Sequence, residues 1–197
     1  MSVYKLLLCP ADPDNPAIDS ATLVGRLRET GLTGNPVSTG TATVYPTGER
    51  FLQLITFLGC SPAIELDLPA GASARAAACD SGAVCHIRLS QTSDGLRFRA
   101  DSRMAPPRCP ACRQPLSNWT DRIDAWRHNP ARTSWQCRHC HHQGRLFDLN
   151  FRKNGGFGHT FIEIWGIHPS EAVPVPALLD TLENLSGCPW QTLYIKD

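Results

Sequence analysis

The hydrophobic positions at the start of the chain change from a strand pattern to a helix pattern. The largely apolar segment Val3–Leu8 is followed by Cys9-Pro10 and predicts a short buried strand. After a proline-rich loop, apolar residues recur at the spacing of one helix face, at Leu23, Val24 and Leu27. Asp19 or Ser20 suits the N-cap of this helix, and Gly31 suits its C-terminal stop. We therefore predict one strand followed by one helix.

Strand patterns dominate residues 37–99. Short apolar runs, period-2 alternation and β-branched residues predict strands at Thr41–Tyr45, Phe51–Leu58, Ala63–Leu68, Val84–Leu89 and Leu96–Arg99. The last two are expected to pair around a turn at residues 93–95. Between them and the earlier strands, Pro69–Gly82 is rich in alanine, glycine and serine, and we interpret it as a loop.

The C-terminal part of the chain repeats the alternation of strand and helix. Leu146–Arg152 and Phe157–Ile167 are predicted to form a hairpin around Asn154-Gly155-Gly156. Four leucines then share one helical face within Pro174–Ser186, at Leu178, Leu179, Leu182 and Leu185. Gly187 ends this helix, and Trp190–Ile195 is expected to close the chain as a strand.

Cysteine spacing is the most specific signal in the sequence. Four of the nine cysteines form two Cys-x-x-Cys pairs separated by 24 residues, at Cys109, Cys112, Cys137 and Cys140. Two residues between the cysteines of a pair allow one tight turn, or knuckle, to point both sulfurs at one ion. An odd total does not suit a disulfide framework, so the pattern favours a metal site in a reducing compartment. Four thiolates leave no open coordination position, which predicts a structural site.

These knuckles resemble the zinc-ribbon class, in which paired Cys-x-x-Cys turns lie on β-hairpins. The resemblance covers about residues 106–152 and implies a structural Zn²⁺ held by the four cysteines. One departure is that Arg113 and His141, where such knuckles often have glycine, follow the second cysteine of each pair. Iron in the rubredoxin manner remains an alternative metal. A histidine could replace one thiolate ligand, and the candidates are His139, His141 and His142. A thioredoxin-like redox role for Cys109 and Cys112 is a further alternative.

Together these elements predict an α+β fold. The simplest arrangement that buries both leucine stripes is a mixed β-sheet with two short helices on one face. We expect residues 1–105 and 146–197 to form this body. Residues 106–145 are expected to be an inserted zinc-ribbon module, the cysteine module.

Charge is divided unevenly along a chain whose net charge is +1. Residues 102–153 carry ten Lys or Arg against three Asp, a net of +7, whereas the remainder has nine against fifteen, a net of −6. Tryptophan and arginine, which are enriched at interaction hot spots and suit stacking and phosphate contacts, are interleaved in the cysteine module. The candidate partner-binding residues are Trp119, Arg122, Trp126, Arg127 and Arg132. Burial of the tryptophans against the knuckles is the alternative explanation.

We therefore predict a zinc-binding, non-enzymatic interaction or adaptor protein whose basic module contacts nucleic acid or an acidic protein surface. An enzyme is the alternative, with a thiol or metal site at Cys60 or at the Cys85-His86 pair. A packed thiol is the ordinary condition of such cysteines. No apolar stretch is long enough to span a bilayer and no secretory signal is evident, so we expect a cytoplasmic protein.

Overall fold

The computed structural model describes residues 3–39, 42–58, 64–91, 95–168 and 171–196. Its helices are α1 (Ser20–Glu29), α2 (Phe51–Leu54), α3 (Ala72–Ser81), α4 (Trp119–His128) and α5 (Pro176–Ser186), with a 3₁₀ turn η1 (Leu146–Asp148). Its strands are β1 (Tyr4–Pro10), β2 (Val37–Ser38), β3 (Thr43–Pro46), β4 (Ile55–Phe57), β5 (His86–Gln91), β6 (Arg97–Ala100), β7 (Ser134–Gln136), β8 (Gln143–Arg145), β9 (Gly155–Gly158), β10 (Thr160–Trp165), β11 (Ala172–Pro174) and β12 (Trp190–Lys196).

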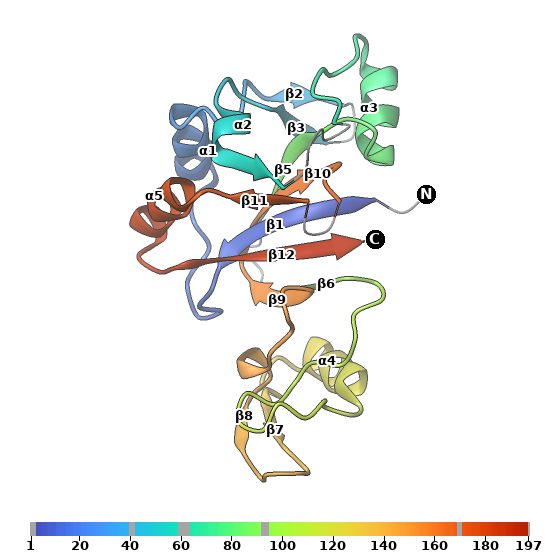
Figure 1. Ribbon diagram of the computed structural model, residues 1–197, viewed down its shortest axis with the longest axis vertical. Helices are drawn as coiled ribbons and strands as arrows, with labels where there is room; N and C mark the ends of the chain where they lie inside the picture. The colour runs from blue at the N-terminus through green and yellow to red at the C-terminus, as the bar shows by residue number, and fades with distance from the viewer. Residues whose placement is uncertain (1–2, 40–41, 59–63, 92–94, 169–170, 197) are drawn as a thin grey trace.

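A six-stranded sheet in the order β12-β1-β10-β5-β3-β2 forms the upper part of the molecule in Figure 1. The α+β class is confirmed. We expected a mixed sheet, and every pairing between neighbouring strands of this sheet in the described residues is antiparallel. None of the helices in these ranges is long and apolar enough to cross a membrane.

Both helices predicted from leucine spacing form, and both cover the same face of the sheet. The carboxylate of Asp19 caps α1 by accepting a hydrogen bond from the Thr22 backbone N–H at 2.8 Å. Glycine in the left-handed region ends α5 at Gly187, with φ 75°. The leucine stripes of both helices pack with one face of β1 and β10 in a single cluster that includes Leu6, Leu8, Leu23, Leu27, Ile162, Ile164, Leu178 and Leu182.

The opposite face of the sheet is divided between apolar and charged side chains. Successive side chains of a strand point to opposite faces, so the residues between those of the first cluster lie here. Five of them form a separate apolar cluster: Leu7, Cys9, Phe161, Leu193 and Ile195. Lys5 and Glu163 lie on the same face, because Lys5 pairs with Trp165 and Leu7 pairs with Glu163 across β1 and β10. Charged side chains on an otherwise buried sheet face are unusual, and they require partners that compensate their burial.

The chain leaves the upper part of the molecule after β6 and returns to it at β9. These two strands pair antiparallel with each other, from Arg97 opposite Gly158 to Ala100 opposite Gly155. The excursion between them lies below the sheet in Figure 1 and contains α4, β7 and β8. A further hydrophobic cluster joins the excursion to the β6–β9 pair, and its members include Leu116, Ile123, Trp126, Trp135, Phe151 and Phe157.

Three predictions in residues 51–82 are wrong. Phe51–Leu54 is one helical turn, because the Leu54 N–H bonds to the Arg50 carbonyl at 3.0 Å, and only Ile55–Phe57 of the expected strand is extended in a sheet. Residues 64–68 do not form a strand, although the Glu65 carbonyl accepts a hydrogen bond from the Cys85 N–H just before β5. The expected loop contains α3, which the high helix propensity of its alanines explains.

Two predicted strand pairings are also wrong. β5 pairs with β10 and β3, whereas β6 pairs with β9, so β5 and β6 do not form the expected pair. The expected hairpin of residues 146–167 is absent from the described chain there, since η1 occupies its start and β10 pairs with β1 and β5. Arg152 and Lys153, both with positive φ, redirect the backbone before β9.

A matched pair of glycines gives a direct test of this fold. A β-carbon at Gly48 would collide with the Gly31 carbonyl and lie 2.9 Å from the Thr33 backbone nitrogen. We expect Gly48→Ala to lower the free energy of unfolding by about 1–3 kcal/mol, as overpacking does. Gly25→Ala is the control, because Gly25 lies within α1 and its added methyl group has no neighbour within 4 Å. It is expected to raise that free energy by up to about 1 kcal/mol in urea titrations.

Candidate metal centre

Each Cys-x-x-Cys pair forms the same hydrogen-bonded turn. In the first knuckle the Arg113 N–H donates to the Cys109 carbonyl and the Cys109 N–H donates to the Gln114 carbonyl, both at 2.9 Å. The second knuckle repeats these two bonds between His141, Cys137 and His142, at 3.0 and 2.8 Å. The repeated geometry follows from the shared spacing and turns both cysteine side chains of each pair to one side.

The residue after each knuckle has a left-handed backbone conformation. Arg113 has φ 61° and His141 has φ 58°, the region in which glycine is the least strained residue. The sequence departure at these two positions therefore does not prevent the knuckle turn. A non-glycine residue has a conformational penalty of about 1–2 kcal/mol in this region, which favourable contacts elsewhere in the centre must offset.

The two knuckles converge. The sulfurs of Cys109 and Cys140 are 3.7 Å apart and those of Cys112 and Cys137 are 3.6 Å apart, with all four sulfurs within 4.8 Å of one another. A tetrahedral ion with metal–sulfur bonds of about 2.3 Å requires sulfurs separated by roughly 3.8 Å. The four cysteines can therefore hold a metal ion, and within the described ranges they form the only cluster of three or more Cys, His, Asp or Glu with ligand atoms this close.

The four cysteines differ in their exposure to solvent. Cys109 and Cys137 are buried, Cys112 is partly buried and Cys140 is exposed. Backbone N–H groups of Cys140 and His139 donate to the Cys137 sulfur and lower its pKa to about 6. Although the Gln114 backbone N–H donates to the Cys112 sulfur, desolvation and hydrogen bonds to the other three sulfurs outweigh this bond and raise the pKa of Cys112 to about 12. The four sulfurs thus share protons, which a metal ion would displace, because the thiolate is the ligand.

The three histidines beside the second knuckle lie outside the sulfur cluster. His139, His141 and His142 are all exposed, and the His142 ring lies 5.8 Å from that of Trp135. The all-cysteine set supplies the four ligands that a tetrahedral ion needs without them.

The tryptophans of the cysteine module are used mainly in packing. Trp126 is 4% exposed and its ring makes an edge contact with Phe157 of β9, centroid to centroid 5.0 Å. Trp135 is buried and donates from its indole nitrogen to the Arg145 carbonyl at 2.7 Å. Trp119 is partly buried beside Phe98 of β6. Trp126 and Trp119 thus connect α4 to the β6–β9 pair, and the indole of Trp126 is not at the surface.

The predicted arginines lie at or near the surface. Arg127 and Arg132 are exposed, and Arg127 pairs with Asp124 at 2.9 Å. Arg122 is partly buried and lines an open groove beside β7 and β8. Among the described residues its Nε has no hydrogen-bond partner, which leaves one donor of this guanidinium unsatisfied.

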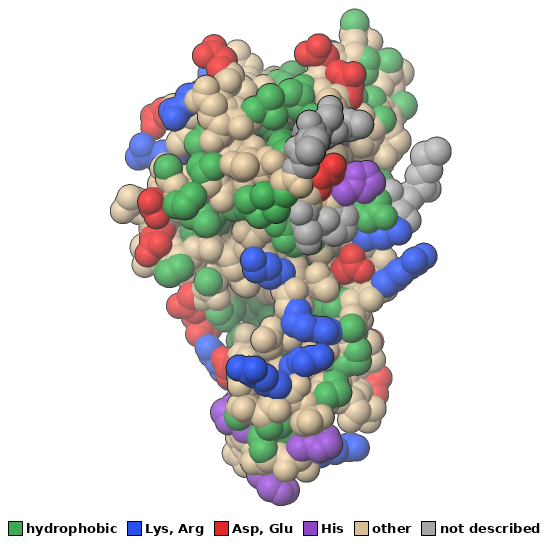
Figure 2. All heavy atoms as spheres, in the orientation of Figure 1, with side chains coloured by type: hydrophobic (Ala, Val, Ile, Leu, Met, Phe, Trp, Pro, Cys, Tyr) green, Lys and Arg blue, Asp and Glu red, His purple; other side chains and the backbone are tan. Residues whose placement is uncertain are grey.

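Positive charge extends over both knuckles. Arg113, Arg132 and Arg138 are exposed, and within the described part of the chain none of the three forms an ion pair. We call these three residues, together with Arg122 and Arg127, the basic surface. On the face drawn in Figure 2, Lys and Arg side chains gather in the lower half, whereas Asp and Glu are more frequent over the sheet and its helices.

The alternative thiol sites have different surroundings. Cys60 lies outside the described residues. Burial raises the pKa of Cys85 to about 12 and lowers the pKa of His86 to about 4. A nucleophilic thiol requires a lowered pKa, so the surroundings of Cys85 oppose that chemistry.

No protein-family model, no curated protein and no solved structure matches this chain. The fold and the site define this chain as an α+β protein with a four-cysteine cluster that can hold a metal.

Proposed function

We propose that the four cysteines bind one structural Zn²⁺ and that the cysteine module is an inserted, non-enzymatic binding module. The observation that carries the metal assignment is the convergence of four sulfurs at separations suited to tetrahedral coordination. Elemental analysis of purified protein is expected to give one zinc per chain. A protein with visible thiolate-to-iron absorption and stoichiometric iron would contradict zinc as the metal.

We infer that the basic surface contacts nucleic acid through its phosphates. Three exposed arginines have no ion-pair partner in the described chain, and they lie in the segment that carries a net charge of +7. Two of them, Arg113 and Arg138, are direct sequence neighbours of Cys112 and Cys137. Arginine forks match phosphate oxygens, and fixed cations release counterions from nucleic acid on binding. An acidic protein surface is the second candidate partner. It has the negative charge of nucleic acid but lacks the regular phosphate backbone.

A charge-matched pair of triple variants tests this proposal. Arg113→Gln, Arg132→Gln and Arg138→Gln together should weaken binding to single-stranded and duplex oligonucleotides at low salt. The slope of log affinity against log salt should become shallower by about 0.7 to 0.9 for each phosphate that the variant no longer neutralises. The control triple removes three exposed arginines outside the module, Arg26→Gln, Arg28→Gln and Arg50→Gln.

The controls separate a binding surface from general charge. Equal weakening in both triple variants would show that only net charge matters, and absence of oligonucleotide binding at low salt would remove nucleic acid as the partner. In that case a salt-sensitive complex with an acidic protein, abolished in the first triple alone, would be the remaining form of the proposal.

A further inference from the structure

A cavity of about 790 Å³ lies between the sheet and the segment that returns from the cysteine module. Its lining comes from β12, α5 and the loop after β1 on one side, and from residues 147–157 on the other. In Figure 1, β12 is the edge strand of the sheet that faces this returning segment. Small-molecule sites commonly have volumes of roughly 300–1,000 Å³ and often lie between two structural units, so the cavity suits a small ligand.

The outer edge of β12 presents backbone hydrogen-bonding groups on the side of this cavity. The Tyr194 N–H donates away from β1, to the Lys153 carbonyl at 2.7 Å. Because alternate residues of an antiparallel strand direct their backbone groups to the same side, the N–H and carbonyl of Thr192 also point away from β1. Thr192 lines the cavity, and within the described ranges its N–H makes no hydrogen bond to another segment. One donor and one acceptor thus lie side by side at the cavity wall.

The larger apolar side chains of the lining are Phe147, Leu149, Phe151, Phe157, Leu179 and Trp190. Phe147 and Leu179 are partly exposed, whereas the other four are buried. The Phe147 ring makes edge contacts with the rings of Trp126 and Phe157, at centroid distances of 6.3 and 4.7 Å. An aromatic ring held in this way provides a surface on which a planar heterocycle can stack.

Two adjacent cations of the lining have no carboxylate partner. Arg152 and Lys153 are both exposed, and neither forms an ion pair in the described parts of the chain. Arg152 donates to the neutral Pro106 carbonyl at 3.3 Å, which leaves its charge available to an anion. The described lining contains no Asp or Glu. The acidic neighbours of lining residues in the sequence are Asp14 and Asp148, which pair with Arg145, and the exposed Asp12 and Asp180.

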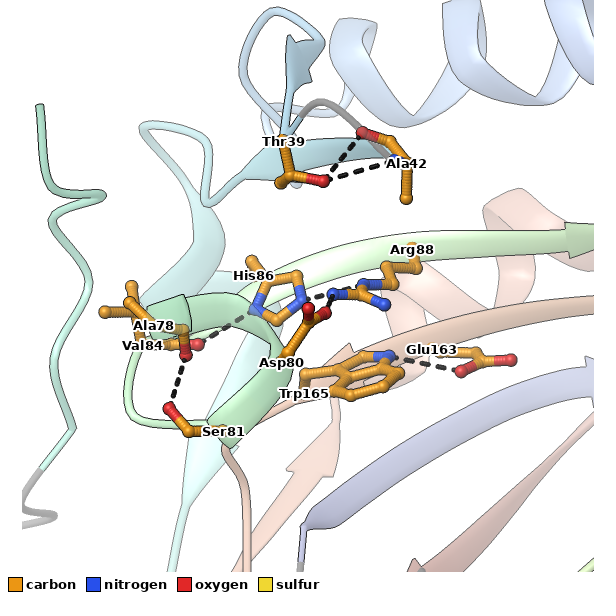
Figure 3. A network of polar contacts seen from close by, with 10 residues as sticks. All are labelled: Thr39, Ala42, Ala78, Asp80, Ser81, Val84, His86, Arg88, Glu163 and Trp165. Atoms are coloured by element: carbon orange, nitrogen blue, oxygen red, sulfur yellow. Dashed lines mark hydrogen bonds and ion pairs between the residues drawn. The ribbon is translucent and has the colours of Figure 1, made fainter. Parts of the chain in front are cut away.

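The arginines on the face of the sheet opposite the helices differ from these two cations, because they already have carboxylate partners. Glu163 is 3% exposed, accepts a hydrogen bond from the Trp165 indole nitrogen at 3.1 Å and pairs with Arg99 at 3.1 Å. Arg88 lies beside this cluster around Glu163 and pairs with Asp80 at 2.8 Å, as Figure 3 shows. These contacts compensate the burial of the charged groups and serve the fold.

We propose that the cavity beside β12 binds a nucleotide, with the base between Thr192 and Phe147 and the phosphate at Arg152 and Lys153. The neighbouring N–H and carbonyl of Thr192 match the donor and acceptor edge of a base, the apolar wall matches its ring, and the two cations match a phosphate. A small carboxylate would leave the apolar wall uncovered, and a hydrocarbon chain would leave the cations and the backbone groups unused. The site requires neither the metal nor the basic surface.

Calorimetric titration of the full chain with the four ribonucleoside monophosphates tests this proposal. We expect saturable binding of at least one of them at a single site, with weaker binding of its nucleoside and of inorganic phosphate. Lys153→Gln should weaken nucleotide binding about tenfold, as loss of a charge-assisted hydrogen bond does, and change nucleoside binding by less than about twofold. This variant should keep the fold, because Lys153 contacts β12 through its backbone carbonyl.

Two controls accompany these titrations. Arg138→Gln removes an exposed cation that does not line the cavity, and it should bind the nucleotide within about twofold of the unmodified protein. Thr192→Pro removes the outward N–H at an edge-strand position, where proline is tolerated, and should weaken the binding of nucleotide and nucleoside alike. Thr192→Val retains the N–H and should bind both as the unmodified protein does.

The source of the nucleotide is either the free molecule or a nucleic-acid strand. Competition by a short single-stranded oligonucleotide, measured in the Arg113, Arg132 and Arg138 triple variant, assigns it to a strand. Mononucleotide binding without such competition assigns it to the free molecule. Because the triple variant lacks the central arginines of the basic surface, failure there leaves the cavity unaffected. Absence of saturable binding by all four nucleotides, or equal affinity of Lys153→Gln and Arg138→Gln, would overturn the proposal.

Discussion

Replacing Cys137 by serine is expected to abolish the proposed metal binding and to unfold the cysteine module. Zinc binding by four thiolates supplies folding free energy on the order of 10 kcal/mol, and serine is a poor ligand for the ion. If the four cysteines hold a metal as proposed, its loss would also remove the bonds that tie together the knuckles preceding Arg113 and His141, both of which have positive φ. The sheet core is a separate hydrophobic cluster, so we expect β1, β10 and β12 to remain paired.

Metal content and amide hydrogen exchange measure this outcome together. Cys137→Ser should contain far less than one metal per chain and lose protection in residues 108–142, with protection retained in the sheet. Cys188→Ser is the matched control, because Cys188 lies outside the sulfur cluster and next to the hydroxyl of Ser186. If Cys137→Ser kept stoichiometric metal, the ligand set would be wrong.

Trp126→Ala is expected to be the most destabilising change away from the cysteines. Truncating a buried tryptophan typically lowers the free energy of unfolding by about 3–5 kcal/mol. Here the lost packing involves both the module and the β6–β9 pair, because Trp126 contacts Phe147 of η1 and Phe157 of β9. Denaturant titration of the metal-loaded protein measures the difference.

Arg132→Ala provides the contrast. The side chain is exposed and without an ion pair in the described chain, so stability should change by less than about 0.5 kcal/mol. Trp126→Ala thus tests the packing of the module, and Arg132→Ala tests its binding. If Trp126→Ala retained full stability and abolished oligonucleotide binding instead, the indole would be a contact residue and not a core residue.

Features encoded by neighbouring residues could be predicted from the sequence. The helices at α1 and α5 carry their own caps and leucine stripes, and each Cys-x-x-Cys pair defines its own knuckle. The α3 helix is also encoded locally, by five alanines within Ala72–Ser81, and the loop prediction counted these alanines with glycine and serine as loop residues.

Features that depend on distant segments could not be predicted in this way. β9 has the sequence Gly-Gly-Phe-Gly, which no strand propensity favours. Its glycines are explained by packing, since a β-carbon at Gly156 would lie 3.1 Å from Leu193 of β12. The cluster around Glu163 likewise joins residues from four strands: the sheet order brings Lys5 and Arg88 to it, and Arg99 comes from the separate β6–β9 pair.

The antiparallel pairing of β6 with β9 has a consequence for shortening the chain. Ala100 and Gly155 are direct neighbours, so the departing and returning ends of the long excursion already lie where a tight turn would join them. Removing the excursion would therefore leave the order of the strands unchanged. If residues 106–145 are an inserted module as proposed, we expect a shortened chain, with a two-residue turn between β6 and β9 and polar residues at Phe98 and Phe157, to keep the pairing of β1, β10 and β12.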